Sequence, residues 1–402
     1  MAVGALIAAY QEDDSGGLRA LLPLAGRTLL EYQVRCAAAA GAVPVVVIVE
    51  RVPQLLQDAF ERLRLEGVAV FPVSDVHEAV SRFETGSMIL LLGDGVVPPA
   101  ELVAELAADG EPVVATVPDD EEHHGFERID GHARWAGVAI VGAQLLGSTA
   151  AMLGDWDLQS TLLRRAIQEG AERVPVTPDS GRPLLVESAD QLEGFQSRMI
   201  AASRGGRSDW ASRYILPPVE ELATVQLLET SLRPGWLIWA ALLLTICGAL
   251  AFARGWLVTG LVLLVLSTPL DLIASRLARL RLRPLPARLV SRAALWPAAG
   301  FALLTLGWWE MRHVAGWGAL ISAAAAIGFA EATRIEKGSL SIPGDQWLLS
   351  RRNAIFAAIP FALAGAWTGY LVALFAYAAV SFYYTQHARH LDRVDPELTR
   401  PR

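Results

Sequence analysis

Asp271 is the residue whose type and position most directly suggest chemistry. It follows an apolar run that begins near Gly255, and a basic stretch begins with Arg276. A carboxylate at the end of a membrane helix is costly, so it is a functional candidate by default. The alternative is structural, because Asp271 is also close enough in sequence to pair with Arg276 or Arg279 at the membrane surface.

The segment 271–279 resembles the first half of the CDP-alcohol phosphotransferase signature, D-x-x-D-G-x-x-A-R. Asp271, Ala278 and Arg279 match it, whereas Ala274 and Ser275 replace the second aspartate and the glycine. The resemblance implies that Asp271 is a remnant of the catalytic and metal-binding acids and that Arg279 contacts the nucleotide.

The second half of this signature, G-x-x-x-D-x-x-x-D, has no counterpart in the sequence. Its positions are occupied by Arg288, Arg292 and Trp296 at one spacing, and by Leu289, Ala293 and Pro297 at the other. Hard divalent cations require several oxygen ligands, so one carboxylate does not hold two of them. We therefore expect a largely degraded phosphotransferase site; the alternative is an active enzyme with rearranged metal ligands.

The first half of the chain carries a second resemblance. The stretch 24–32, LAGRTLLEY, is similar to the G-x-P-L-L-E-Y motif of nucleotidyltransferases that act on sugar or alditol phosphates, but Tyr10 and Gln11 replace the glycines of that family's phosphate loop. A displaced turn follows, and its amides can still face an anion. The nucleotide contacts expected there are Gly16, Gly17 and Arg19.

Asp94 and Gly95 follow the strand-like run MILLLG, where this family places its metal-holding aspartate and contacts the nucleotide. Asp157, or Asp155 beside it, is the expected second carboxylate. Two acids that hold Mg²⁺ between substrate phosphates are the arrangement that nucleotidyl transfer requires. The alternative for Asp94 is a simple turn.

The segment 119–137 contains two weaker candidates. His123 and His124 lie in an acidic run, which favours a solvated loop over a metal site. The residues ERIDGHARWAG after them indicate a hairpin beside the nucleotide pocket, with Arg128 or Arg134 as possible phosphate contacts.

The elements that must position these residues are of two kinds. Short apolar runs alternate with helical stretches up to about residue 200, which predicts a doubly wound α/β sheet of the GT-A or Rossmann-like nucleotidyltransferase type. Long apolar runs then predict an all-α bundle of six transmembrane helices. The runs are 236–253, 255–273, 293–309, 316–329, 354–367 and 369–384. The expected division is a cytoplasmic domain over 1–200, an amphipathic juxtamembrane helix over 201–234, a membrane domain over 235–390 and a tail over 391–402.

Charge follows the same division. Of 42 acidic and 34 basic residues, 34 acidic and 18 basic precede Pro234, so the two parts carry net charges of −16 and +8. An acidic first half argues against nucleic-acid binding. Basic residues concentrate in alternate loops of the second half, which predicts an integral protein of the inner (cytoplasmic) membrane with both termini in the cytoplasm. Only two cysteines occur, which excludes a disulfide framework.

The order of the two halves resembles that of bifunctional inositol-phosphate cytidylyltransferase and phospho-inositol-phosphate synthases. The resemblance implies membrane lipid, CTP or a CDP-alcohol as ligands, Mg²⁺ as cofactor, and a homodimer. With most catalytic acids missing, we expect a divergent, catalytically degraded protein of phospholipid or phosphodiester head-group metabolism that assists an active partner. The alternative is an active bifunctional nucleotidyltransferase and phosphatidyltransferase.

Overall fold

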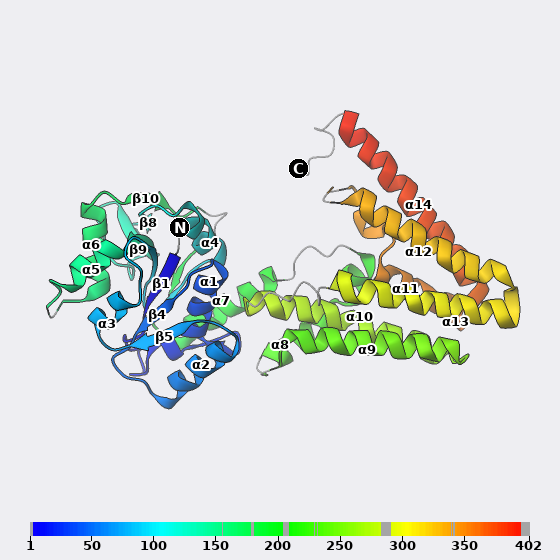
Figure 1. Ribbon diagram of the computed structural model, residues 1–402, viewed down its shortest axis with the longest axis horizontal. Helices are drawn as coiled ribbons and strands as arrows, with labels where there is room; N and C mark the ends of the chain where they lie inside the picture. Colours follow the sequence, from blue (N-terminus) through cyan, green and yellow to red (C-terminus); the bar gives the residue numbers. More distant parts are fainter. Residues whose placement is uncertain are drawn as a thin grey trace. The chain divides into compact units, whose positions relative to one another are not determined.

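The protein is described from a computed structural model of the chain (Figure 1). The residues described are 3–154, 156–177, 181–203, 209–228, 230, 232–282, 291–338, 340 and 342–394. They divide into two compact units, one formed by 1–201 with 280–283 and the other by the rest of the chain.

The N-terminal unit contains a seven-stranded sheet in the order β10-β8-β9-β6-β1-β4-β5. Its strands are β1 (Val3–Ala8), β4 (Val45–Ile48), β5 (Val70–Val73), β6 (Met88–Leu92), β8 (Val113–Pro118), β9 (Ala133–Gly142) and β10 (Glu172–Pro175). All neighbouring pairs are parallel except the two that involve β9. The predicted α/β class of the first unit is therefore confirmed.

Helices cover both faces of this sheet. One apolar core joins it to α1 (Leu29–Ala39), α2 (Gln54–Leu65) and α4 (Ala100–Asp109). The other joins it to α3 (Val76–Ser81), α5 (Ala143–Ala150) and α6 (Leu158–Gln168). Consecutive residues of β1 alternate between the two cores, as side chains of a strand must.

Smaller elements complete this unit. They are η1 (Arg19–Leu21), β2 (Pro23–Leu24), β3 (Arg27–Thr28), β7 (Val96–Val97), β11 (Leu184–Leu185) and α7 (Ala189–Ala202). The motif LAGRTLLEY forms the β2–β3 turn and the first turn of α1. There Thr28 and Glu31 make a capping box, in which each side chain accepts the other's backbone N–H.

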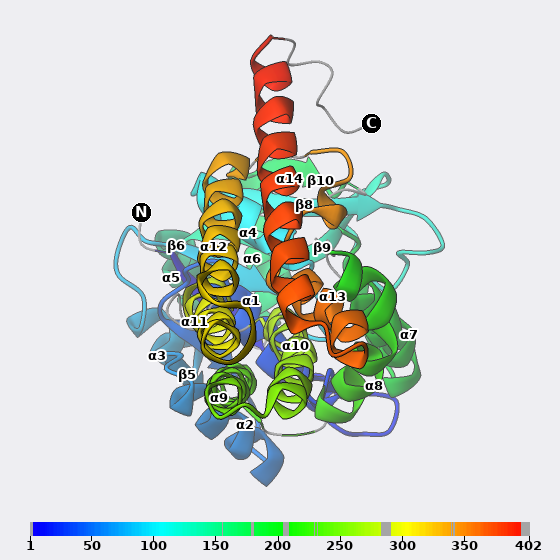
Figure 2. The same cartoon turned by 90° about the vertical axis from the view of Figure 1, so that its right-hand side faces the viewer.

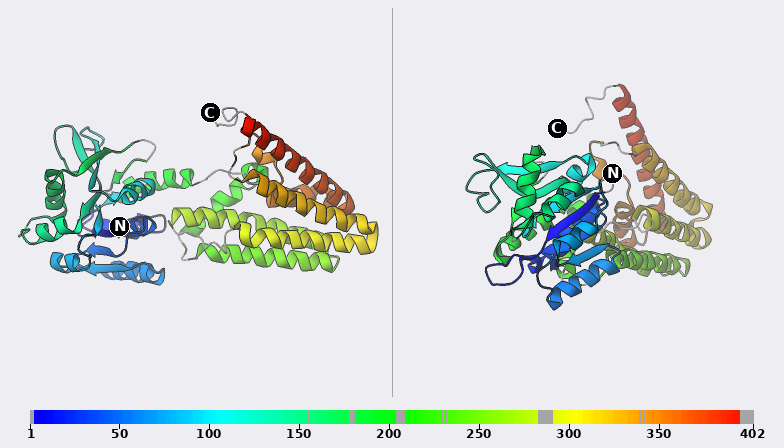
Figure 3. Two further views of the ribbon diagram at one scale, coloured as in Figure 1. Left: turned by 45° about the horizontal axis from the view of Figure 1, so that its top comes forward. Right: turned by 60° about the vertical axis from the view of Figure 1, so that its left-hand side comes forward.

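The C-terminal unit is helical. It contains η2 (Ala211–Ile215), α8 (Pro217–Leu228), α9 (Pro234–Ala253), α10 (Leu257–Leu280), α11 (Ser291–Glu310), η4 (Met311–Ala315), α12 (Trp317–Lys337), η5 (Asp345–Trp347), α13 (Arg351–Leu363) and α14 (Trp367–Val394). Figure 2 looks nearly along α9, α10 and α11, and Figure 3 shows the long helices side by side. One apolar core contains residues from all six helices α9 to α14.

Each predicted span coincides with one of these helices, but they differ in length. Among the described residues, three helices are long and apolar enough to cross a membrane, namely α9, α10 and α12. The 13 residues of α13 rise about 20 Å, less than the ~30 Å hydrocarbon core. Six crossings therefore remain a prediction, and the structure supports three candidate spans.

The predicted juxtamembrane helix corresponds to α8, with η2 before it. Asp209 precedes η2, and its Oδ1 accepts a capping hydrogen bond from the Ser212 N–H at 2.9 Å. Along α8 the apolar Leu222 is 65 % exposed, whereas Glu220 and Thr224 are buried. The exposed face of this helix therefore includes large apolar side chains, and its buried face includes Glu220 and Thr224 beside Leu228.

Candidate functional site

The turn between β6 and β7 carries Asp94, the strongest sequence candidate of the N-terminal unit. The Asp94 carboxylate is buried, and its Oδ2 accepts hydrogen bonds from the backbone N–H groups of Tyr10 at 2.8 Å and Gln11 at 2.7 Å. Its Oδ1 has no hydrogen-bond partner among the described residues. Asp94 thus fixes the segment that stands in place of a phosphate loop and still presents one uncommitted oxygen.

Two buried glutamines hold this turn in place. Gln159 of α6 accepts from the Asp94 N–H at 3.3 Å and donates to the Leu92 carbonyl at 2.8 Å, while Gln33 of α1 donates to the carbonyls of Gly93 and Val96. Burial raises the pKa of Asp94 to about 6, against the opposing effect of the two N–H donors. Burial therefore makes the ionised form of the Asp94 carboxyl group less favourable than it would be in water.

Asp157 caps the N-terminus of α6, where its Oδ2 accepts from the Ser160 N–H at 2.8 Å. Its Oδ1 accepts from the Tyr10 hydroxyl at 2.5 Å. Burial, and then the hydrogen bond to Asp157, raises the pKa of Tyr10 well above its usual range, so the phenol stays protonated. Tyr10 thus bridges the two predicted metal-binding acids, with its backbone N–H on Asp94 and its hydroxyl on Asp157.

The predicted phosphate turn is closed on itself. Asp13 accepts hydrogen bonds from the backbone N–H of Gly16 through its carbonyl, at 3.0 Å, and from that of Gly17 through its Oδ1, at 2.8 Å. Both amides predicted to face an anion therefore donate to Asp13 in this conformation. The glycines form a tight turn, and their role in nucleotide binding stays a prediction.

Arg19 and Gly95 lie together beside Asp94. Gly95 has φ +69°, and a Cβ there would lie 2.9 Å from the Val186 carbonyl oxygen and 3.0 Å from Arg19 Cδ. The Arg19 guanidinium donates to the Glu12 carbonyl and to Gln11 Oε1. The structure therefore brings Arg19, Gly95 and Asp94 together.

The predicted hairpin over 127–137 is present, closed by a bridge between Arg128 and Arg134. Arg134 donates to Asp119 Oδ1 and to two loop carbonyls, so its guanidinium is engaged in holding the hairpin. His123 contacts Asp120 Oδ1 at 2.6 Å. Among the described residues no three His, Cys, Asp or Glu side chains cluster in a way that would hold a metal ion.

In the C-terminal unit Asp271 lies on α10 and is 1 % exposed. Its two carboxylate oxygens accept hydrogen bonds from consecutive residues at the start of α13, Oδ1 from Arg351 at 3.0 Å and Oδ2 from Arg352 at 2.6 Å. The alternative reading of a structural ion pair thus gains support, although its partners come from a helix about 80 residues away. Arg276, the partner considered from sequence, donates to Glu220 and Ser203.

A second acid completes this cluster. Arg352 Nη1 donates to Asp209 Oδ2 at 2.6 Å, and Arg351 Nη1 donates to Ser267 Oγ at 3.2 Å. Asn353, next along α13, accepts from the Ala211 N–H and donates to the carbonyls of 346 and 348. Asp209, Asp271, Arg351 and Arg352 therefore form a buried quartet of zero net charge, which we call the ionic quartet.

The remaining residues singled out from the sequence either make few contacts or lie outside the described residues. Arg279 donates to the Ser203 carbonyl at 3.0 Å. Arg288 and Leu289 lie outside the described residues, as does Asp155, and the side chains of Arg292 and Ala293 are also outside them. In the N-terminal unit, Tyr10 contacts both Asp94 and Asp157, and their role as Mg²⁺ ligands stays a prediction.

Sequence reasoning missed three residues of these sites. The sequence indicates Tyr10 only as a replacement for a glycine, and it places Arg351 and Arg352 only among the basic residues that predict the orientation of the second half. A usable signal was present in the second case, because two adjacent arginines that directly follow the capping Ser350 must lie in the first turn of a helix.

Residues 15–175 match the family model described as "MobA-like NTP transferase domain". No curated protein matches the chain. Among solved structures, a Bacillus anthracis protein assigned as a glucose-1-phosphate thymidylyltransferase, in complex with sucrose, aligns with a TM-score of 0.40 and 11 % identity. The alignment covers 49 % of this chain and 95 % of that one.

Proposed function

We propose that this is an integral membrane protein whose nucleotidyltransferase-like domain is catalytically degraded, binds nucleotide, and assists an active enzyme of phospholipid or phosphodiester head-group metabolism. The nucleotidyltransferase character of the first unit rests on the family match over 15–175. The loss of activity rests on Tyr10, and the kinship with CDP-alcohol phosphotransferases rests on the residues around Asp271.

Tyr10 is the observation that carries the proposal. A working nucleotidyltransferase needs two acids converging on Mg²⁺ and free N–H groups facing the phosphates. Here the N–H groups of Tyr10 and Gln11 donate to Asp94, and the Tyr10 hydroxyl donates to Asp157. Apart from Asp94 Oδ1, the groups that should bind metal and phosphate satisfy one another, so the cation that activates a bound nucleotide is held too weakly for catalysis.

The ionic quartet supports the same conclusion for the second unit. A metal-dependent phosphotransfer needs an excess of negative charge to hold cations against a pyrophosphate. Asp271 instead contacts two guanidinium groups, and these groups are fixed by Asp209 and Ser267. Fixed cations therefore occupy the surroundings of the remaining acid.

Embedding in a membrane is supported by what the helices expose. Large apolar side chains line the outer faces of α9 and α10, among them Trp239, Leu243, Ile246, Leu250, Val262 and Leu266. Contiguous apolar surface of this kind is rare on soluble monomers. We further propose the inside-positive orientation with cytoplasmic termini, and the domain division given above, for which α9 begins the membrane part.

Nucleotide titration of full-length protein in detergent tests the first unit. We expect CTP with Mg²⁺ to bind without release of pyrophosphate when an alcohol phosphate is added. Tyr10→Gly removes the hydroxyl and so frees Asp157 Oδ1, while the backbone N–H groups of residues 10 and 11 can still donate to Asp94, and it should raise the Mg²⁺-dependent affinity about tenfold. Asp94→Asn in that background should remove the gain. Pyrophosphate release by the wild-type protein would refute catalytic degradation.

For the second unit the decisive measurement is CMP release from a CDP-alcohol in the presence of lipid and Mg²⁺. We expect none. If the wild-type protein releases CMP and Asp271→Asn does not, the second unit is an active phosphotransferase.

That alternative has one specific observation in its favour. Asp94 Oδ1 is buried without a hydrogen-bond partner among the described residues, and a carboxylate oxygen in this state is suited to accept a cation. Displacement of Tyr10 by a nucleotide would then complete the site.

We also propose that the protein forms a homodimer through α12. Ala324 and Gly328 are four residues apart on its exposed face, a spacing that permits close helix approach. Crosslinking of the full-length protein in membranes should yield dimers, and a product that is entirely monomeric would contradict this part of the proposal.

A further inference from the structure

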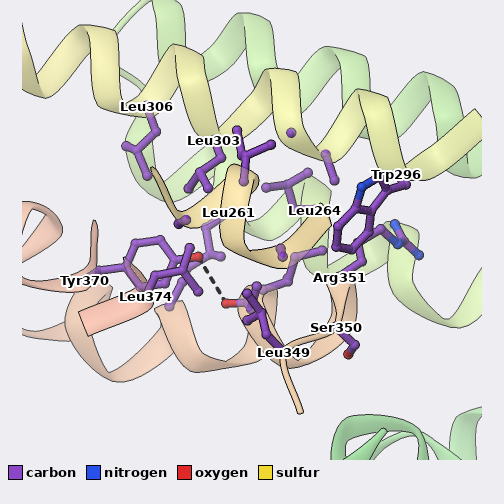
Figure 4. Close-up of a pocket in the computed structure, with 18 of the residues that line it drawn as sticks. Leu261, Leu264, Trp296, Leu303, Leu306, Leu349, Ser350, Arg351, Tyr370 and Leu374 are labelled. Atoms are coloured by element: carbon purple, nitrogen blue, oxygen red, sulfur yellow. Dashed lines mark hydrogen bonds between the residues drawn. The ribbon is translucent and has the colours of Figure 1, made fainter. Parts of the chain in front are cut away.

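The helices α10 to α14 enclose an apolar pocket, which Figure 4 shows in close-up. Its lining is formed mainly by Leu, Ala and Ile side chains, and the space between them, including the part open to the surroundings, is about 740 Å³. Because this space includes the open side, the pocket is a groove that is partly open to the surroundings. All lining residues belong to the C-terminal unit.

Polar groups in this pocket are confined mainly to one end. Arg351, Ser350 and Trp296 lie together there, and Leu306 and Tyr370 lie at the opposite end (Figure 4). The Tyr370 hydroxyl is engaged, because it donates to the Ala354 carbonyl at 3.1 Å. The pocket is therefore amphiphilic: at its polar end Arg351 donates to Asp271 and the Trp296 Nε1–H donates to Glu331, and the long remainder is hydrocarbon-like.

Its length corresponds to half a bilayer. Trp296 and Leu306 line opposite ends and are ten residues apart on α11, a rise of about 15 Å along the helix axis. The hydrocarbon core of a bilayer is about 30 Å thick, so one leaflet supplies about 15 Å. Tryptophan and arginine at one end are the residues that favour the head-group level.

The Arg351 guanidinium at the polar end retains donors for a ligand. A guanidinium has five N–H donors, and the contacts of Arg351 with Asp271 and Ser267 use two of them. Guanidinium groups bind phosphate oxygens through charge-assisted hydrogen bonds. A nucleoside, by contrast, would find few partners for its base and ribose along a wall of Leu, Ala and Ile.

We infer that this pocket holds one acyl chain of a glycerophospholipid, whose phosphate lies against Arg351 at the polar end. The inference rests on the proposed membrane embedding of this unit and goes beyond it by naming the occupant and its site. The lipid is retained as a bound component, and no bond of it is made or broken.

Two glycine substitutions test occupancy. Gly300 lines the pocket, and the nearest atom to an added Cβ is Ile327 Cδ1 at 3.8 Å, so Gly300→Leu places a side chain in the cavity without a backbone clash. Gly318→Leu on α12 is the matched control, since Gly318 is exposed and nothing lies within 4 Å of an added Cβ.

Full-length proteins are purified from membranes in mild detergent, and bound phospholipid is counted by native mass spectrometry. Wild type and Gly318→Leu should carry about one phospholipid per chain, and Gly300→Leu at least about tenfold less. Equal phospholipid in Gly300→Leu and the control would overturn the inference.

A second arm tests the head group with delipidated protein and two probes of equal chain length, phosphatidic acid and diacylglycerol. Arg351→Gln should weaken the binding of phosphatidic acid about tenfold and leave that of diacylglycerol unchanged. Arg351→Lys, which keeps the charge, should restore most of the loss. Equal weakening of both probes would refute the phosphate contact.

Alkaline carbonate extraction distinguishes a failure of this inference from a failure of the proposed membrane embedding. Release of the wild-type protein from membranes would refute membrane embedding. Retention in membranes without a stoichiometric phospholipid would refute the pocket's occupant alone.

Discussion

The two candidate sites hold their acids in different ways. In the N-terminal unit Asp94 and Asp157 are bridged by neutral donors of one residue, Tyr10. In the C-terminal unit Asp271 is held by two fixed cations that another acid also contacts. A neutral hydrogen-bonded bridge can be displaced at the cost of a few hydrogen bonds, whereas breaking a buried ion pair leaves uncompensated charge. The first site is therefore closed reversibly, and the second is built into the fold.

Removal of Asp271 should have the largest effect. Asp271→Ala leaves Arg351 and Arg352 without their shared partner and should cost about 3 to 5 kcal/mol of unfolding free energy. Equilibrium unfolding in mixed detergent measures it. The control is Asp345→Ala, which breaks a partly exposed pair with Lys337 and should cost less than about 1 kcal/mol. Equal losses would show that the ionic quartet is no more than a surface pair.

The substitution Asp94→Asn should give the next largest effect, which is a change in how the stability of the protein depends on pH. Because its folded pKa of about 6 lies above the unfolded value of 3.8, its stabilising contribution is present at low pH and is lost as the pH rises towards 6. The stability of Asp94→Asn relative to wild type should therefore rise by about 2 kcal/mol between pH 4 and pH 7. Hydrogen exchange of the β6 amides, compared at each pH between the two proteins, measures this difference.

Asp13→Asn is the control, because its effect on the pH dependence of stability should have the opposite sign. Hydrogen bonds from Ser15 and Gly17 lower the pKa of Asp13, so its contribution is present at neutral pH and lost on acidification. The relative stability of that variant should fall as the pH rises. A flat profile for Asp94→Asn would contradict the buried, protonatable carboxyl group.

The turn that aims Asp94 should be sensitive to a single methyl group. Gly95→Ala combines a positive φ with an approach of 2.9 Å to the Val186 carbonyl oxygen, and should cost about 2 kcal/mol. Gly16→Ala has a positive φ but open space around the added methyl, and should cost about 1 kcal/mol. Thermal unfolding of both variants measures the difference, and a smaller loss for Gly95→Ala would show that the turn relaxes.

Tyr10→Phe should have the smallest effect on stability. It deletes one hydrogen bond to Asp157 and keeps the ring, for a loss of about 1 kcal/mol. It should also strengthen the binding of Mg²⁺ with nucleotide, as read by titration. Tyr32→Phe deletes a hydrogen bond to the Pro98 carbonyl and should leave nucleotide binding unchanged. If both variants bind alike, the Tyr10 hydroxyl does not obstruct the site.

Local patterns predicted most of the elements. The residues that specify β1, those that specify β6 and those that begin α1 each lie within one short stretch of sequence. Sequence periodicity detects spacing over such short distances. The length of α13 was harder, because its apolar run is continuous in sequence with the loop and helix that follow Leu363. Only the fold shows where the helix ends and the chain turns.

The sequence by itself determined the α/β first unit, the apolar helices of the second, and the scarcity of acids around Asp271. Tertiary structure alone decided that Tyr10 reaches Asp94 and Asp157, which lie 84 and 147 positions away, and that Asp271 meets Arg351 and Arg352. The reason is physical: neighbouring residues constrain backbone conformation, whereas contacts over such separations depend on how whole elements pack.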